Sequence, residues 1–166
     1  MTTSPMQLLP AVDVKAGAVF QNTDTDVKVS EFFGSPAEVI ASFVNFGSKW
    51  IHLVDLDTAY GTGENSQLIN NLVGSYQVNF QVSGGISNSF TLERALKSKA
   101  KWINLSTACL MDIEWTLDQI KAHSGRIGIS LDVLNGVLTA RGSNTVVGDL
   151  QTYVEILSKA GCTRFV

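Results

Sequence analysis

The chain has 166 residues, 45% of them hydrophobic, and a formal net charge of −3 at pH 7. This composition allows a sizeable buried core, and the acidic balance excludes a basic surface suited to nucleic acid. No stretch reaches the roughly 18 apolar residues of a membrane span, and the first residues lack the basic start and apolar run of a signal peptide. We therefore expect a soluble, cytoplasmic protein that acts on a small molecule.

Apolar runs alternate with helical periodicity along the chain. Strands are predicted near residues 7–13, 50–55, 77–83, 101–105, 126–132 and 162–166. Helices are predicted between them: one from Pro36 to about Gly47, one from Asn65 to Gly74, one capped by Asn88 or Ser89, and two near residues 113–120 and 150–157. The order is therefore β-α five times, followed by a sixth strand.

Two segments of the sequence match each other. Leu8–Val14 and Ile127–Val133 are apolar runs that reach an aspartate, Asp13 or Asp132, with a glycine four residues after it. Such a repeat predicts a parallel α/β barrel of two similar halves, with the two aspartates facing each other across the mouth. A small doubly wound domain is the alternative, because it needs no closure. An open sheet, however, gives no reason for its first and fifth strands to match.

The length of the chain bears on closure of this barrel. Eight β-α units typically need about 250 residues, whereas this chain reaches Val166 inside its sixth predicted strand. We therefore expect residues 1–166 to form a single, partial TIM-barrel domain of about five and a half units. Its first and sixth strands would be unpaired edges, which are prone to associate. The full-length barrel is expected to be a monomer.

Four stretches carry a resemblance to one enzyme family: Leu8–Val14, Trp50–Asp57, Ser83–Ile86 and Asn104–Ala108. In this order they are similar to the phosphoribosyl isomerases of histidine biosynthesis, and most to the actinobacterial form, which in many members also serves tryptophan biosynthesis. The resemblance covers essentially the whole chain. It implies a (β/α)8 TIM barrel without a cofactor that converts the aminoaldose phosphate ProFAR to its aminoketose by an Amadori rearrangement.

Two other functions stay open at this stage. The related cyclase of the same pathway, part of imidazole glycerol phosphate synthase, also has two matching halves and a first-strand aspartate. It usually lacks the Val-Asp-Leu-Asp run found at Val54–Asp57. The other alternative is an inactive fragment that only binds phosphate.

An Amadori rearrangement needs an acid that protonates the ring oxygen and a base that removes the proton from C2. We assign Asp13 as the base and Asp132 as the acid; the alternative for each is a carboxylate that caps a loop or helix. The resemblance also implies a catalytic aspartate after strand six, beyond Val166, which would make Asp132 a supporting residue. Of Asp55 and Asp57, we expect one to hold loops through hydrogen bonds. His52 is expected to be a core histidine.

One substrate phosphate is expected at the ends of the third and fourth strands. Glycines there allow close backbone approach, and helix N-termini supply a positive end; a plain tight turn is the alternative. The phosphate-binding residues predicted from this pattern are Ser83, Gly84, Gly85, Ser106 and Thr107. Arg141 is a further candidate substrate contact, with a solvated loop arginine as its alternative.

The sequence also departs from the family pattern. Phe20–Gln21 stand where the family usually has an arginine, and the loop from there to Ser35 is acidic and polar. Ser87 replaces a second arginine, and Ser143 replaces the tryptophan of the dual-substrate enzymes. We therefore expect weaker phosphate binding and activity on the histidine-pathway substrate alone. Cys109 and Cys162 lack the spacing of a metal site, so we expect reduced structural thiols and no metal.

Overall fold

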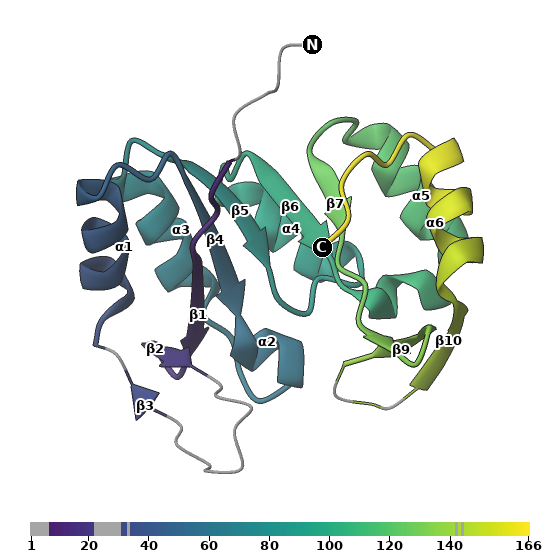
Figure 1. Cartoon of the computed structure of the whole chain (residues 1–166), viewed down its shortest axis with the longest axis horizontal. Coiled ribbons are helices and arrows are strands. Elements are labelled where there is room, and N and C mark those ends of the chain that lie inside the picture. The colour runs from purple at the N-terminus through teal and green to yellow at the C-terminus, as the bar shows by residue number, and fades with distance from the viewer. Residues whose placement is uncertain (1–6, 22–30, 33, 142, 144) are drawn as a thin grey trace.

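The computed structural model describes residues 7–21, 31–32, 34–141, 143 and 145–166. Five parallel strands follow one another across the sheet in chain order, and a single bridge from Ile129 to Phe165 continues it. These strands are β1 (Ala11–Lys15), β4 (Trp50–Asp55), β5 (Asn79–Ser83), β6 (Trp102–Leu105) and β7 (Ile127–Ile129). Figure 1 shows a curved sheet with helices along its outer side. The fold is that of a TIM barrel that is not closed.

Six α-helices and one short 3₁₀-helix lie in the described residues, and two of them, α2 and η1, were not predicted. They are α1 (Pro36–Asn45), α2 (Leu56–Tyr60), α3 (Ser66–Ser75), α4 (Ser89–Lys97), α5 (Ile113–Ala122), α6 (Leu150–Lys159) and the short 3₁₀-helix η1 (Thr107–Met111). Ser35 caps α1 with Pro36 in its first turn, and Asn88 caps α4 through the Thr91 N–H. The predicted starts of these two helices are confirmed.

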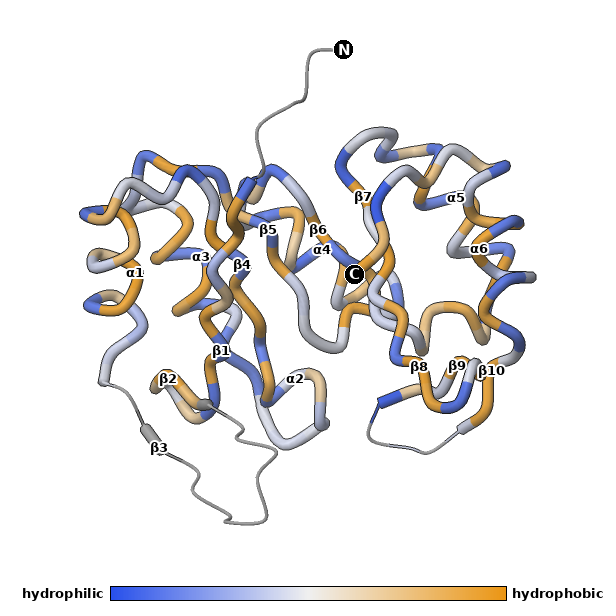
Figure 2. Tube along the Cα trace, in the orientation of Figure 1, coloured by the Kyte–Doolittle hydropathy of each residue, from blue (hydrophilic) through white to orange (hydrophobic). Residues whose placement is uncertain are grey.

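Alternation along the strands separates an outer from an inner face of the sheet. The outer residues are apolar and at most 4% exposed, and they pack against the helices: Val12, Val14, Ile51, Leu53, Phe80, Val82, Ile103 and Leu105. Figure 2 shows the same hydrophobic colouring on the strands and on one side of each surrounding helix. The core therefore lies between sheet and helices. Polar residues of the inner face, such as Asp13, His52 and Ser83, line the inside of the curve near the strand tips.

Stacked side chains fill the inner face at the end of the sheet opposite the strand tips. The rings of Trp50 and Trp102, the first residues of β4 and β6, lie 3.8 Å apart between centroids. The Arg164 guanidinium covers Trp102 at 4.4 Å. Asn104, two residues after Trp102 on β6, is 1% exposed. Neither its amide nitrogen nor its amide oxygen has a hydrogen-bond partner within the described part of the chain.

Three predictions about the strands are corrected by the structure. Residues 162–166 continue the parallel sheet beside β7 as predicted, through backbone hydrogen bonds with Ile129 and Leu131, but the paired length is a single bridge at Phe165. The strand predicted over 126–132 ends at Ile129, because the chain then enters a separate antiparallel sheet of β8 (Val133–Leu134), β9 (Val137–Ala140) and β10 (Thr145–Asp149). The edge of β1 is not wholly unpaired either.

That edge of β1 pairs with a strand that the sequence analysis did not predict. β2 (Ala18–Gln21) returns antiparallel to β1 and pairs with its last two residues, and β3 (Glu31–Phe32) pairs with β2. Because the hairpin extends β1 to Lys15, Asp13 lies inside the strand and not at its tip.

The acidic loop predicted before Ser35 falls mostly outside the described residues. No helix in the described ranges is long and apolar enough to cross a membrane.

Candidate active site

Both aspartates of the repeat are followed by a two-residue hairpin turn. Ala16 and Gly17 join β1 to β2 with φ angles of 48° and 77°, and Asn135 and Gly136 join β8 to β9 with φ angles of 52° and 79°. Two consecutive positive φ angles are the signature of a type I′ turn. The two halves therefore share a local structure as well as a sequence pattern, and each turn fixes the chain just beyond its aspartate.

The first of these turns is held from outside. The Ala16 N–H donates to Asp57 Oδ2 at 2.6 Å, and the Gly17 N–H donates to Asn65 Oδ1 at 3.1 Å. The Asn65 amide also donates to Asp57 Oδ2 at 2.8 Å. The two bonds that Asp57 accepts, from Ala16 and from Asn65, lower its pKa, and the bond from Ala16 has the larger effect. The β1–β2 hairpin is thereby fixed to the segment after β4.

Asp55 organises that same segment. It accepts hydrogen bonds from the backbone N–H and the hydroxyl of Thr58, and from the backbone N–H and the amide of Asn65. Asp55 thus caps α2 and ties it to the start of α3. The expectation that one of Asp55 and Asp57 holds loops is confirmed, and in fact both do.

The glycine turn after β5 lies against α2. Gly84 and Gly85 have φ angles of 114° and 63°, and a Cβ on either would clash with backbone atoms of Asp55 or of Thr58 and Ala59. Only glycine permits this approach. The turn and α2 therefore form one compact unit at the strand tips, and part of the glycine requirement comes from this packing.

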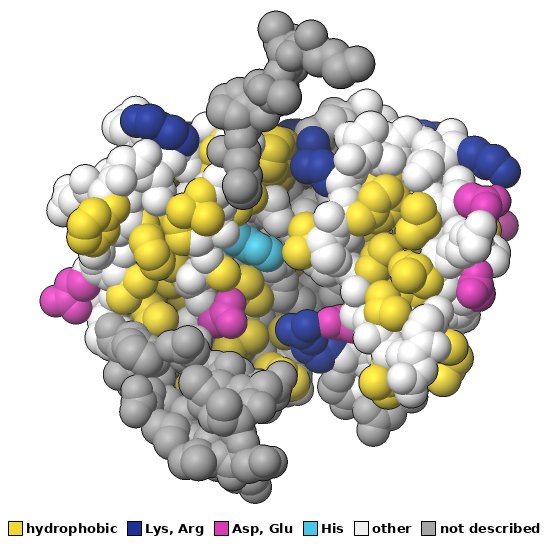
Figure 3. All heavy atoms as spheres, viewed as in Figure 1, with side chains coloured by type: hydrophobic (Ala, Val, Ile, Leu, Met, Phe, Trp, Pro, Cys, Tyr) yellow, Lys and Arg dark blue, Asp and Glu magenta, His cyan; other side chains and the backbone are white. Residues whose placement is uncertain are grey.

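A cavity of about 570 Å³ opens on the inner face at the tips of the strands. It is bounded by residues of β1, β4, α2, the β5 and β6 tips, the segment after β7, Arg141 and Ser143. Figure 3 shows this face hollowed between the two halves, with basic and acidic side chains at the hollow. Small-molecule sites commonly have volumes of about 300–1,000 Å³. We call it the central cavity.

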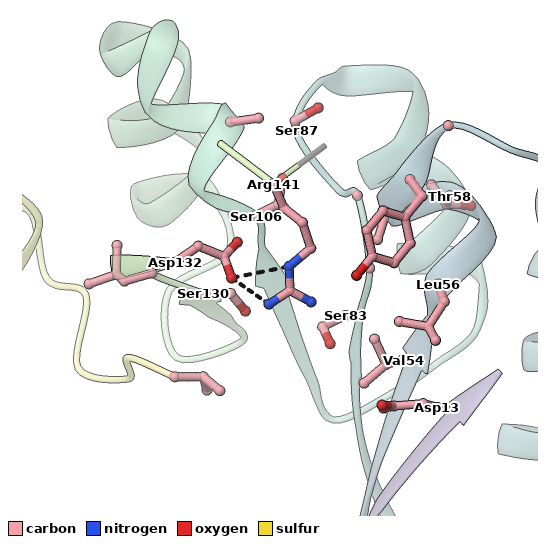
Figure 4. A pocket seen from close by; sticks show the side chains of 18 of the residues that line it. Asp13, Val54, Leu56, Thr58, Ser83, Ser87, Ser106, Ser130, Asp132 and Arg141 are labelled. Atoms are coloured by element: carbon pink, nitrogen blue, oxygen red, sulfur yellow. Dashed lines mark hydrogen bonds and ion pairs between the residues drawn. The ribbon is translucent and has the colours of Figure 1, made fainter. Parts of the chain in front are cut away.

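Asp13 and Asp132 lie on opposite sides of the central cavity, with Arg141 reaching between them (Figure 4). Burial raises the pKa of Asp13, against a smaller lowering by the positive charge of Arg141. Asp132 forms an ion pair with Arg141, which donates to its Oδ1 from Nε at 3.1 Å and from Nη2. The two carboxylates thus have different surroundings, one desolvated and one paired.

His52 also reaches the central cavity. Its Nε2 lies 2.7 Å from the Ser83 hydroxyl oxygen, and burial lowers its pKa. The imidazole is therefore neutral at physiological pH, as expected of a hydrogen-bonded interior histidine. It nonetheless lines the cavity, which the sequence analysis did not predict.

The predicted phosphate residues divide into two groups. Ser83, Gly84, Gly85 and Ser106 line the central cavity, whereas Thr107 is fully buried. The Thr107 hydroxyl donates to the Ser130 carbonyl at 2.9 Å and accepts from the Asp132 N–H at 2.7 Å. Its side chain therefore positions Asp132, and Thr107 itself is not among the residues that line the central cavity.

Ser106 is likewise engaged. Its N–H and its hydroxyl both donate to the Ile86 carbonyl, at 2.8 Å and 3.3 Å. These bonds join the tip of β6 to the glycine turn after β5. Ala108 in the first turn of η1 lines the cavity at the same edge, and the first N–H groups of a helix have no acceptor within it.

Neither cysteine lines the central cavity. Cys109 and Cys162 are buried and free, and burial raises the pKa of the Cys109 thiol to about 12. Their burial agrees with a structural role, and the reduced state of the thiols stays a prediction. Among the described residues, no group of three or more His, Cys, Asp or Glu side chains could hold a metal ion.

Comparison with known proteins identifies the family to which the chain belongs. Residues 7–166 match the family described as histidine biosynthesis protein. The chain is 38% identical over 163 residues to phosphoribosyl isomerase A of Streptomyces avermitilis, covering 98% of this chain and 67% of that protein. It is 37% identical over 163 residues to an imidazole-4-carboxamide isomerase of Bifidobacterium longum subsp. infantis whose name specifies two phosphoribosyl groups, covering 97% and 68%. The chain therefore spans about two thirds of the length of these relatives.

Proposed function

The chain belongs to the histidine biosynthesis protein family, and we propose that it is an aldose–ketose isomerase of that pathway, acting on a phosphoribosylamino imidazole-carboxamide. The reaction is an Amadori rearrangement of an aminoaldose phosphate to an aminoketose phosphate. The observation that supports it best is the placement of Asp13 and Asp132 on opposite sides of one central cavity. The relatives are named isomerases, so the cyclase and the inactive fragment have no support.

The proposed chemistry moves one hydrogen from C2 to C1 of the sugar and a second from the C2 hydroxyl to the former ring oxygen, and it neither adds nor removes atoms. An acid protonates the ring oxygen, the bond between that oxygen and C1 breaks, and a protonated Schiff base forms. A base then removes the proton from C2, and the resulting enolamine takes a proton at C1 and loses one from the C2 hydroxyl to give the ketone. Two carboxylates held in different protonation states can perform these steps.

Asp13 is the proposed base. It lies on the inner face of β1, and its raised pKa makes its carboxylate a better proton acceptor than an exposed aspartate. The hairpin held by Asp57 and Asn65 fixes the strand that carries it.

Asp132 is the proposed acid, and Arg141 controls it. A carboxylate paired with a guanidinium has no proton to give, so this role requires Arg141 to exchange Asp132 for an anionic group of the substrate. Arg141 is 47% exposed in its side chain, which leaves it room to turn. Its proposed second role is therefore contact with the substrate.

The substrate phosphate is proposed to bind at the glycine turn and the start of η1. Among the described residues that line the central cavity, Arg141 is the single lysine or arginine. Backbone N–H groups of Gly84, Gly85 and Ala108 would therefore carry much of the phosphate binding. With Ser87 where an arginine is common, we expect weaker binding than an arginine-bearing site would give.

The test extends this chain by the C-terminal third of the Streptomyces avermitilis protein and compares the chimera with the chain itself. We expect the chimera to isomerise the aminoaldose substrate, and Asp13→Asn to lower its turnover about 10²–10⁴-fold with an unchanged circular dichroism spectrum. Asp118→Asn, the same change on the exposed side of α5, is the matched control. Normal turnover in Asp13→Asn would remove Asp13 as the base.

The same assay addresses substrate scope. Ser143 lines the central cavity where the dual-substrate enzymes carry tryptophan. We therefore expect little or no turnover of phosphoribosylanthranilate. Comparable efficiency on both substrates would show that this interpretation of the loop is wrong.

A further inference from the structure

We propose that Tyr60 forms an aromatic wall of the central cavity on which the planar imidazole-carboxamide part of the substrate stacks. This inference rests on the proposed function and adds a specificity-determining residue to it. The sequence analysis singled out no role for Tyr60, and expected an aromatic platform to be missing because Ser143 replaces a tryptophan.

The two sides of the central cavity differ in chemistry. The side after β7 is polar, with Asp132, its partner Arg141 and Ser130. Figure 4 shows Val54 and Leu56 on the opposite side, carried by β4 and α2. Tyr60, the last residue of α2, belongs to the same side of the cavity lining as Leu56. A flat, weakly polar ring therefore has a matching apolar surface on one side only.

Tyr60 is an exposed aromatic residue inside a cavity. It keeps 48% of its surface exposed, and no other Phe, Tyr or Trp of the described residues lines the central cavity. A large apolar side chain left accessible in a concave site, with polar groups facing it, is typical of ligand recognition. In contrast, Phe90 on α4 is 67% exposed but lies outside this lining.

The backbone that carries Tyr60 is fixed at both ends. Asp55 caps the start of α2 through the Thr58 N–H at 3.1 Å. Gly61 ends the helix in a left-handed conformation, and the Thr62 N–H donates to the Asp57 carbonyl at 2.9 Å. A ring on a fixed backbone with two side-chain torsions loses little conformational entropy when a ligand stacks on it.

The same helix lies against the proposed phosphate turn. The Thr58 carbonyl and the Ala59 N–H approach Gly85 so closely that no Cβ fits between them. Tyr60 therefore follows directly after the residues that touch the glycine turn. A phosphate held at that turn places the heterocycle attached to its ribose beside α2, where the Tyr60 ring is available.

The test measures binding, so it does not depend on turnover. Calorimetric titration of the chain uses two probes: 5-aminoimidazole-4-carboxamide ribonucleotide, which has the heterocycle, and ribose 5-phosphate, which lacks it. We expect Tyr60→Ala to weaken the ribonucleotide about 10-fold, within the range of aromatic stacking, and to change ribose 5-phosphate less than about twofold. Tyr60→Phe should keep both affinities, because the ring carries the effect. Phe90→Ala, an exposed aromatic outside the cavity, should change neither.

Three results would overturn the inference. If Tyr60→Ala weakens both probes equally, Tyr60 shapes the phosphate turn and does not stack. If it changes neither affinity while wild type binds both probes, stacking is wrong and the proposed function stands. If wild type binds neither probe, both the inference and the proposed substrate class fail.

Discussion

Asp57 gives the sharpest test of how the site is held in place. Its buried carboxylate accepts from the Ala16 N–H at 2.6 Å, from the Asn65 amide at 2.8 Å and from the Thr62 hydroxyl at 3.0 Å. Asp57→Ala leaves the first two donors unpaired. The Asn65 amide is buried, and an unpaired buried donor costs about 1–3 kcal/mol, whereas water can replace the acceptor of the Ala16 N–H at the exposed turn. We therefore expect a loss of about 2–4 kcal/mol in the free energy of unfolding. Asp57→Asn keeps one acceptor oxygen and should cost about 1–2 kcal/mol.

Equilibrium urea unfolding of the chimera measures these losses, with Asp149 as the control. Asp149 is the exposed cap of α6 and accepts from the N–H and hydroxyl of Thr152. Asp149→Asn should be nearly neutral, because asparagine caps helices as well as aspartate. A loss for Asp57→Ala no larger than the roughly 1 kcal/mol of an ordinary cap would refute the argument that this network fixes the hairpin.

The pH dependence follows from the direction of the pKa shift. Hydrogen bonds lower the pKa of Asp57 in the folded state, so its ionised form contributes stability above its ordinary value of 3.8. That contribution is lost as the pH falls through the lower folded pKa. The difference in stability between wild type and Asp57→Ala should therefore be full at pH 7 and shrink at acidic pH.

Two further outcomes are expected. Because burial raises the pKa of Asp13, its charged form destabilises the fold as the pH rises through the folded pKa. Urea midpoints should therefore show Asp13→Asn more stable than wild type at pH 8, and the difference should vanish at pH 3. A difference that does not depend on pH would contradict this. Ala16→Asn should stabilise the fold by about 0.5–1 kcal/mol, because asparagine tolerates the positive φ that Ala16 adopts, and Asn135→Ala at the matching turn should lose a similar amount by the same measurement. Destabilisation by Ala16→Asn would show that its side chain is not accommodated in the turn.

The features that sequence reasoning placed correctly depend on neighbours in the chain. Pro36 in the first turn of α1 and Asn88 as the cap of α4 are signals that each lie at the start of the helix itself, and both starts are confirmed. The apolar runs of β4 and β5 are likewise local. Their burial on the outer face of the sheet follows from period-two alternation.

The features that were missed depend on contacts that are distant in the chain, or on a signal that was not used. Asn135–Gly136 is a strong hairpin signal, but it served only to mark the repeat. Ala16 gives no such signal, because its left-handed conformation depends on Asp57 and Asn65, more than 40 residues away. The engagement of Thr107 with Ser130 and Asp132 was equally out of reach, since it joins the ends of two strands.

The two halves of the repeat therefore hold their aspartates on similar backbone structures but in different electrostatic surroundings. In both halves an aspartate precedes a type I′ hairpin, yet the first turn has outside support through the Ala16 N–H bond to Asp57, and the second has Asn135 at the position of Ala16. Asp13 is desolvated on the inner face of β1, whereas Asp132 is paired with Arg141. A reaction that needs one carboxylate to accept a proton and another to give one requires such a difference. Arg141 pairs with Asp132 and also lowers the pKa of Asp13. A substrate anion that binds Arg141 would therefore break the ion pair of Asp132 and raise the pKa of Asp13 at the same time.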